Sequence, residues 1–238
     1  MKQQNHTTAD RRFRVRSKNL LRNNKLLIIA ELIIALLIVV AYLADFVPLS
    51  ETPFLLLLGW LSLWLRGTGW RAVGLKRPAR WVYTLLLGIT TGVVYQFFSL
   101  YVLEPLIVLL TGKPIDLSQF APIEGNVFLL SLFLVLVWVL GAFGEELVYR
   151  GYLMNRVAEL AGGSSMAWVV SLIFVSILFG VAHLAQGISG VAANISAGLI
   201  YGALYLWSGR NLWAPIVAHG AYDTVALLLI FWSKYPGL

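Results

Sequence analysis

Apolar runs of roughly membrane-spanning length follow one another along most of the chain. They lie at 26–43, 53–65, 82–110, 127–144, 165–185, 189–207 and 212–232. A helix needs about 20 apolar residues to cross a bilayer, and most of these runs approach or exceed that length. With 59% hydrophobic and 12% charged residues, the 238-residue chain lacks the polar residues that cover a soluble domain of this size. We therefore predict an all-α, polytopic transmembrane helical bundle of about seven to eight spans.

The basic residues are distributed unevenly, and their positions predict the orientation of the chain. A basic cluster at 11–25 directly precedes the first apolar run, and the later connecting segments alternate between acidic and basic. Basic segments beside a span are retained in the cytoplasm and attract anionic lipid. We therefore assign the net charge of +7 to topology and membrane lipids, and expect no nucleic acid partner. We expect an integral protein of a bacterial cytoplasmic membrane with its N-terminus in the cytoplasm.

Two adjacent carboxylates, Glu145 and Glu146, directly follow the apolar run 127–144. A charged side chain in hydrocarbon is costly, so an acid at this position suggests a functional site and needs a partner. On an α-helix Glu146 and Arg150 are four residues apart and share a face, whereas Glu145 points about 100° away. We expect Glu146 and Arg150 to form a supporting ion pair. Glu145 is then free for function.

Two of the three histidines also lie in apolar runs. His183 follows Phe179 by one helical turn, and His219 precedes Asp223 by one turn on the same face. A single histidine in a membrane is often only hydrogen-bonded across a helix interface. Together with Glu145, however, the two histidines form a candidate set.

Gly162 and Gly163 predict the turn between the run that carries Glu145 and the run that carries His183. In an antiparallel hairpin both side chains then stand roughly 27–30 Å from the turn, at about 1.5 Å per residue. His219 lies at the same depth only if this turn projects beyond the bilayer. If 165–185 instead starts at the membrane surface, His183 lies near the opposite face and the set does not form.

Three short motifs in sequence order support the first alternative. GEELVYRG, FGVAH and HGAYD resemble the EExxxR, FxxxH and His-x3-Asn/Asp motifs of the CAAX protease and bacteriocin-processing (CPBP or ABI) family, which includes type II CAAX prenyl endopeptidases. The resemblance covers about residues 127 to 232. It implies a helical intramembrane endopeptidase that hydrolyses a peptide bond of a membrane-associated protein or peptide with a glutamate-activated water. The cavity is expected to be reached from the membrane or the cytosol.

The resemblance also implies a role for each motif residue. Glu145 is the general base, His183 holds and activates the water, and His219 with Asp223 stabilises the oxyanion. Glu146, Arg150 and Phe179 support them. The prenyl endopeptidases carry Asn at the position of Asp223, and an ionised Asp cannot donate to an oxyanion, although it can orient His219. Whether a prenylated substrate is required is left open.

The same residues leave a metal site as an alternative. Cysteine is absent, which excludes thiolate ligands and nucleophiles. Glu145, His183, His219 and Asp223 offer the nitrogen and oxygen ligands that zinc accepts, but the HExxH helix of many metalloproteases is missing. We therefore favour no metal and no other cofactor, and keep a divalent metal such as zinc as the alternative.

This interpretation divides the chain into three parts: a basic cytoplasmic tail at 1–25, N-terminal transmembrane helices at 26–120, and a catalytic transmembrane core at 121–238. The small residues of 187–204 are expected to allow close helix packing, although Asn194 can face a cavity. The alternative function is a non-enzymatic bacteriocin-immunity or regulatory scaffold, or a small proton-coupled transporter, because intramembrane acids and histidines also mark transport pathways.

Overall fold

The computed structural model describes residues 24–48 and 50–236, so most of the predicted basic tail lies outside the described residues. The described part is mostly helical and contains no strand. Its α-helices are α2 (Lys25–Leu43), α3 (Thr52–Leu65), α4 (Trp81–Phe98), α5 (Glu104–Thr111), α6 (Val127–Leu136), α7 (Met154–Leu160), α8 (Ser165–Ala182), α9 (Gly187–Trp207) and α10 (Trp213–Phe231). Two π-helices, η2 (Ser99–Leu103) and η4 (Val137–Leu153), and three 3-10 helices, η1 (Trp70–Val73), η3 (Ser118–Ile123) and η5 (Leu184–Gln186), connect them. The predicted all-α fold is confirmed.

The lengths of the helices fit an integral membrane protein. Within the described residues, six helical stretches are long and apolar enough to span a bilayer: Lys25–Leu43, Trp81–Thr111, Val127–Leu160, Ser165–Ala182, Leu184–Trp207 and Trp213–Phe231. The run predicted at 53–65 forms α3, but its 14 residues extend only about 21 Å at 1.5 Å per residue. This is shorter than the hydrocarbon core, about 30 Å thick. Six helices therefore reach spanning length, and α3 is a shorter seventh apolar helix.

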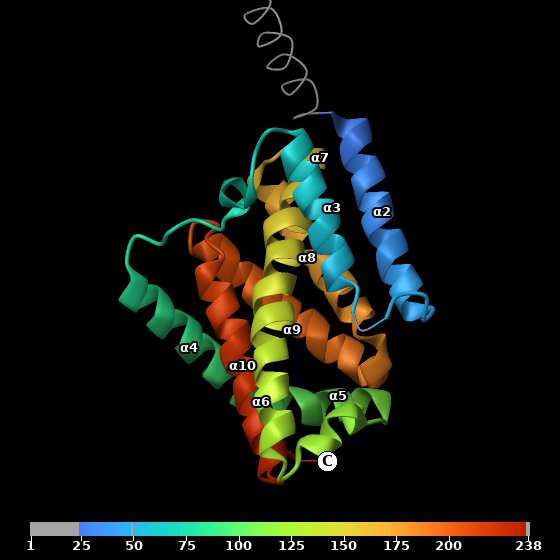
Figure 1. The fold of residues 1–238 in the computed structure, drawn as a ribbon, viewed down its shortest axis with the longest axis vertical. Coiled ribbons are helices and arrows are strands. Elements are labelled where there is room, and N and C mark those ends of the chain that lie inside the picture. Colours follow the sequence, from blue (N-terminus) through green and yellow to red (C-terminus); the bar gives the residue numbers. More distant parts are fainter. Residues whose placement is uncertain (1–23, 49, 237–238) are drawn as a thin grey trace, which may run out of the picture.

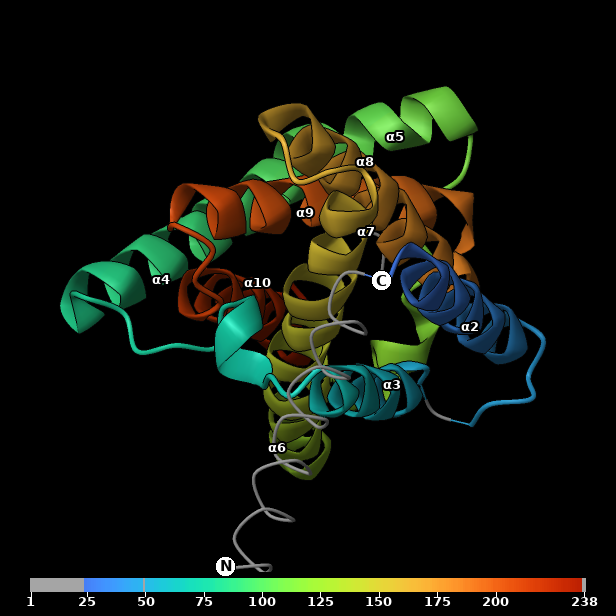
Figure 2. The same cartoon turned by 90° about the horizontal axis from the view of Figure 1, so that it is seen from above.

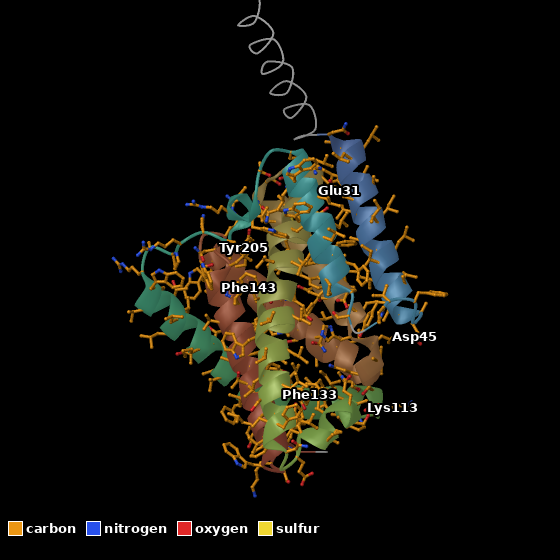
Figure 3. The ribbon with its side chains drawn as sticks, viewed as in Figure 1. Glu31, Asp45, Lys113, Phe133, Phe143 and Tyr205 are labelled. Carbon is orange, nitrogen blue, oxygen red and sulfur yellow. The ribbon has the colours of Figure 1, made fainter. Side chains whose placement is uncertain are left out.

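The bundle has two ends that differ in charge (Figure 1). The basic end, as we name it, holds the start of α2 and the segments 65–80, 160–165 and 208–212. Its charged residues are Lys25, Arg66, Arg71, Lys76, Arg77, Arg80, Arg156, Glu159 and Arg210. The far end holds the segments 44–50, 112–126, 183–187 and 232–236, with Asp45, Lys113, Asp116, Glu124 and Lys234. In Figure 3, Glu31 lies toward the basic end and Lys113 toward the far end.

Small residues set the spacing of the central helices. A Cβ atom on Gly92 of α4 would lie 2.1 Å from the carbonyl oxygen of Ala218 in α10, and one on Gly198 of α9 would lie 2.9 Å from the Cβ of Ser176 in α8. Such close approach is typical of small residues at helix interfaces in membranes. The predicted packing role of the small residues in α9 is therefore confirmed. Figure 2 shows α10, α9 and α8 between α4 on one side and α2 on the other.

The predicted glycine turn joins α7 to α8. Gly162 and Gly163 have φ angles of 90° and 71°, a left-handed conformation that favours glycine. Ser164 then caps α8 by accepting a hydrogen bond from the backbone N–H of Ala167 at 3.2 Å. Because α7 continues from η4, this turn folds α8 back along the segment that carries Glu145.

Candidate active site

The segment that carries both acids is a π-helix, and the α-helix assumed in the sequence analysis was wrong at this point. η4 runs over Val137–Leu153, and the N–H of Met154 donates to the carbonyl of Tyr149, five residues earlier. The turn is therefore wider than that of an α-helix, and the predicted 100° between Glu145 and Glu146 does not apply. Long π-helices are rare, and shorter π segments are frequent at functional sites.

The predicted ion pair forms within η4. Arg150 Nη1 donates to Glu146 Oε1 at 2.8 Å, and the two side chains are 1% and 0% exposed. Arg150 Nη2 also donates to the carbonyl of Gly198 at 3.3 Å, which joins the pair to α9. A charge at this depth requires a partner, and Glu146 and Arg150 neutralise each other.

His219 is surrounded by three carboxylates. Its Nδ1 lies 3.0 Å from Glu146 Oε1 in a hydrogen bond, while its Nε2 lies 3.4 Å from Asp223 Oδ2 and 3.9 Å from Glu145 Oε2. Glu146 Oε1 therefore accepts from both Arg150 and His219. The carboxylate that holds the ring is Glu146, whereas the sequence analysis assigned this contact to Asp223. A carboxylate at Nδ1 fixes the orientation of an imidazole and directs Nε2 to the reacting groups.

His183 is held in a different way. It ends α8, and its Nδ1 lies 2.8 Å from the carbonyl oxygen of Phe179. Because a carbonyl oxygen can only accept, Nδ1 carries the hydrogen, and Nε2 of the neutral ring is left as an acceptor. Phe179 also packs against the His183 ring, with centroids 4.7 Å apart. The predicted support from Phe179 thus consists of one backbone hydrogen bond and one ring contact.

The four predicted catalytic residues lie around one cavity of about 290 Å³. Glu145, His183, His219 and Asp223 all line it, so the residues that the sequence analysis grouped lie around one space. Asn194 lines the cavity as well, and its amide donates to Gln186 Oε1 and to the Gly190 carbonyl, each at 2.9 Å. The position that the sequence analysis allowed for Asn194, facing a cavity, is the one that the structure shows.

Tyr235 lines the cavity just beyond the end of α10. Its hydroxyl donates to Glu104 Oε1 at 3.0 Å. Burial raises the pKa of the Tyr235 hydroxyl well above its ordinary value, so this hydroxyl stays protonated and remains a donor.

Aromatic side chains pack against the rings of both histidines. Tyr201 stacks on His219 with centroids 4.8 Å apart and an interplanar angle of 21°. The guanidinium carbon of Arg150 lies 4.5 Å from the centroid of Phe179 and 5.5 Å from that of Tyr201. Cation–π contacts of this kind compensate in part for the desolvation of a buried arginine. The sequence analysis did not single out Tyr201, because no spacing links it to the three motifs.

A fourth acid, beside the site, was missed. Glu51 lies at the start of α3, is 3% exposed, and accepts a hydrogen bond from the Tyr149 hydroxyl at 2.7 Å. Its side chain makes no capping bond to α3, so its position serves the contact with η4. Next to it, Thr52 lies against Gly144, where an added Cβ would be 2.9 Å from Thr52 Cγ2. In the sequence Glu51 belongs to an acidic connecting segment, which was interpreted as a topology signal alone.

Among residues 24–48 and 50–236, no group of three or more His, Cys, Asp or Glu side chains is placed to hold a metal ion. Glu145 Oε2 is buried and accepts no hydrogen bond from any described residue.

Part of the chain matches a known protein family. Residues 127–225 match the model of the family described as type II CAAX prenyl endopeptidase Rce1-like. The predicted family is confirmed for this segment. The Rce1-like segment extends from the start of α6 into α10 and includes every site residue that the motifs predicted. Glu51 and α3 lie outside it. No curated protein and no solved structure matches the chain.

Proposed function

We propose that this chain is an intramembrane endopeptidase that hydrolyses a peptide bond with a water activated by Glu145. The observation that carries the proposal is that Glu145, His183 and His219 line one cavity. Glu146 orients the His219 ring through a hydrogen bond at Nδ1. The match of residues 127–225 to a family of endopeptidases supports it. The substrate in this proposal is a membrane-associated protein or peptide.

The proposed reaction starts with a water placed between Glu145 and His183. The Glu145 carboxylate takes one proton, His183 Nε2 accepts a hydrogen bond from the other, and the water oxygen attacks the carbonyl carbon of the substrate. In the tetrahedral intermediate the former carbonyl oxygen carries the negative charge. Glu145 then passes its proton to the amide nitrogen, and the C–N bond breaks to give an acid and an amine.

His219 is proposed to stabilise the negative charge on the oxyanion. With hydrogen on both ring nitrogens, it donates to Glu146 from Nδ1 and offers Nε2–H to the oxyanion. Asp223, 3.4 Å from Nε2, compensates for the charge of the ring before the substrate binds. Removing one oxyanion donor lowers kcat by about 10²–10³ in a hydrolase of known mechanism.

The test compares peptide N-termini in membranes and secreted material from cells that express the native chain or its Glu145→Gln variant. The matched control is Asp45→Asn, the same carboxylate-to-amide change at an exposed residue of the far end. We expect specific termini to disappear with Glu145→Gln and to remain with Asp45→Asn. Identical profiles for all three proteins, at equal amounts in the membrane, would refute the proposal and favour the scaffold or transporter.

A further inference from the structure

The cavity that holds the candidate site extends toward one end of the bundle only. Its lining includes residues of the far end and of the helical segments that lead there. Those at the far end are Ser50, Ile115, Leu117, Phe120, His183, Gln186 and Tyr235. Among the described residues, none that lines this cavity belongs to the basic end.

A layer of fully buried side chains separates the site from the basic end. Tyr149, Arg150, Tyr201 and Tyr205 are each at most 1% exposed and rank among the largest buried side chains of the described part. The Tyr205 hydroxyl accepts from Asn155 Nδ2 and donates to the carbonyl of Val73 in the basic end, both at 2.9 Å. Figure 3 shows Tyr205 near the basic end and Phe133, which lines the cavity, toward the far end. These buried side chains lie between Glu145 and the basic end, and the cavity leads from Glu145 to the far end.

The side chains along this route are mostly apolar. Between the far end and the catalytic groups the cavity is lined by Leu117, Phe120, Phe133, Val137, Leu227 and Ile230. Such a lining favours apolar surface at about 25 cal/mol per Å² buried. A shallow groove at the surface shares Ile115, Leu117 and Gln186 with the cavity, which connects it to exposed residues at 113–118.

The charge difference between the two ends fixes which side of the membrane this route faces. Arginine and lysine dominate the basic end, and the positive-inside rule places such an end in the cytoplasm. The far end, with acids and lysines mixed, then faces the other side. The cavity is therefore closed toward the cytoplasm and open toward the non-cytoplasmic side.

We infer that this site acts on substrates from the non-cytoplasmic side, and that its cavity receives an apolar segment of an exported or membrane-inserted polypeptide. The polypeptide nature of the substrate rests on the proposed function, whereas the side of access rests on the cavity and the charges. This differs from access from the cytosol, which was one of the two routes, membrane or cytosol, that the family resemblance implied.

Single cysteines test the side of access, because the natural chain has none. Ala226→Cys places a thiol in the cavity, Gln119→Cys on the exposed far end, and Ala79→Cys on the exposed basic end. Each variant is treated with a membrane-impermeant maleimide in right-side-out and in inverted vesicles. We expect Gln119→Cys and Ala226→Cys to react in right-side-out vesicles, and Ala79→Cys only in inverted ones.

Two results would overturn the inference. If Gln119→Cys reacts only in inverted vesicles, the orientation is the opposite of the one inferred. If Gln119→Cys reacts from outside but Ala226→Cys does not, the cavity does not open on that side. If Ala226→Cys fails to fold, the maleimide reaction of Leu117→Cys, another residue that lines the cavity, tests the same opening.

The substrate class is determined from the peptide N-termini that are present in cells with the native chain and absent in cells with Glu145→Gln. We expect the cuts to lie beside apolar residues in polypeptides on the non-cytoplasmic side, and cuts confined to cytoplasmic proteins would overturn this part. If no termini are lost, the proposed function fails, yet the maleimide experiment still decides the side of access, because it requires no cleavage.

Discussion

Glu51 and Tyr149, 98 positions apart in the sequence, share a buried hydrogen bond of 2.7 Å between the Tyr149 hydroxyl and Glu51 Oε1. The bond connects α3 to the middle of η4, between the two ends of the EExxxR motif. The Tyr149 ring also packs against Phe179, with centroids 5.0 Å apart. The carbonyl of Phe179 in turn accepts the hydrogen bond from His183. A helix outside the Rce1-like segment is thus part of the support of the site.

Tyr149→Phe removes this donor and leaves a buried carboxylate with one hydrogen bond fewer. We expect the free energy of unfolding to fall by about 1–3 kcal/mol, the usual cost of leaving a buried polar group without its partner. Thermal unfolding in detergent measures it, with Tyr83→Phe at an exposed position as the control. Equal stability of the two variants would show that the bond contributes little.

Arg150→Met leaves Glu146 buried without its counter-charge. Because both side chains are almost fully buried, we expect the free energy of unfolding to fall by about 3–5 kcal/mol. The double variant Glu146→Gln, Arg150→Met is expected to lose less than the sum of the two single changes, since each removes the same pair. Strict additivity in a thermal unfolding series would contradict a coupled pair.

Gly92→Ala tests the packing of α4 against α10 close to His219. The added Cβ would lie 2.1 Å from the Ala218 carbonyl oxygen, so the two helices must separate. We expect a loss of about 1–3 kcal/mol in the free energy of unfolding, as for other overpacked sites. Gly69→Ala is the matched control, because nothing lies within 4 Å of its added Cβ and its φ of −146° suits any residue. Similar unfolding temperatures for both variants would contradict the contact.

Removal of divalent metal is expected to leave peptide cleavage by the purified protein unchanged, because the proposed reaction uses only side chains and water. Cleavage before and after treatment with EDTA and phenanthroline, together with the metal content of the protein, checks this. Activity that is lost and then restored by zinc would make Glu145, His183, His219 and Asp223 ligands, the alternative that their residue types allow.

Local sequence patterns predict much of this fold. The apolar runs predict the helices, because burial in lipid requires long apolar segments whatever their packing. The Gly162 and Gly163 pair predicts the α7–α8 turn, since both residues need left-handed backbone angles. The four-residue spacing of Glu146 and Arg150 predicts their ion pair even though the intervening helix is not an α-helix.

Contacts between distant segments could not be predicted in the same way. The bond from Glu146 to His219 joins residues 73 positions apart, and the one from Tyr149 to Glu51 joins residues 98 apart. Both depend on how the helices pack, and no periodicity in the sequence encodes them. The π-helical turns of η4 were missed for a related reason, because tertiary contacts select them over α-helical turns that the same residues also favour.

The buried layer of Tyr149, Arg150, Tyr201 and Tyr205 has a consequence for the energised membrane. A water-accessible cavity in the middle of a bilayer shortens the path that an ion must cross, and each elementary charge gains about 2.3 kcal/mol per 100 mV of membrane potential. The four side chains of the layer are almost fully buried, so we expect most of the voltage across the protein to drop over them. The layer would then keep ions from passing between this cavity and the basic end.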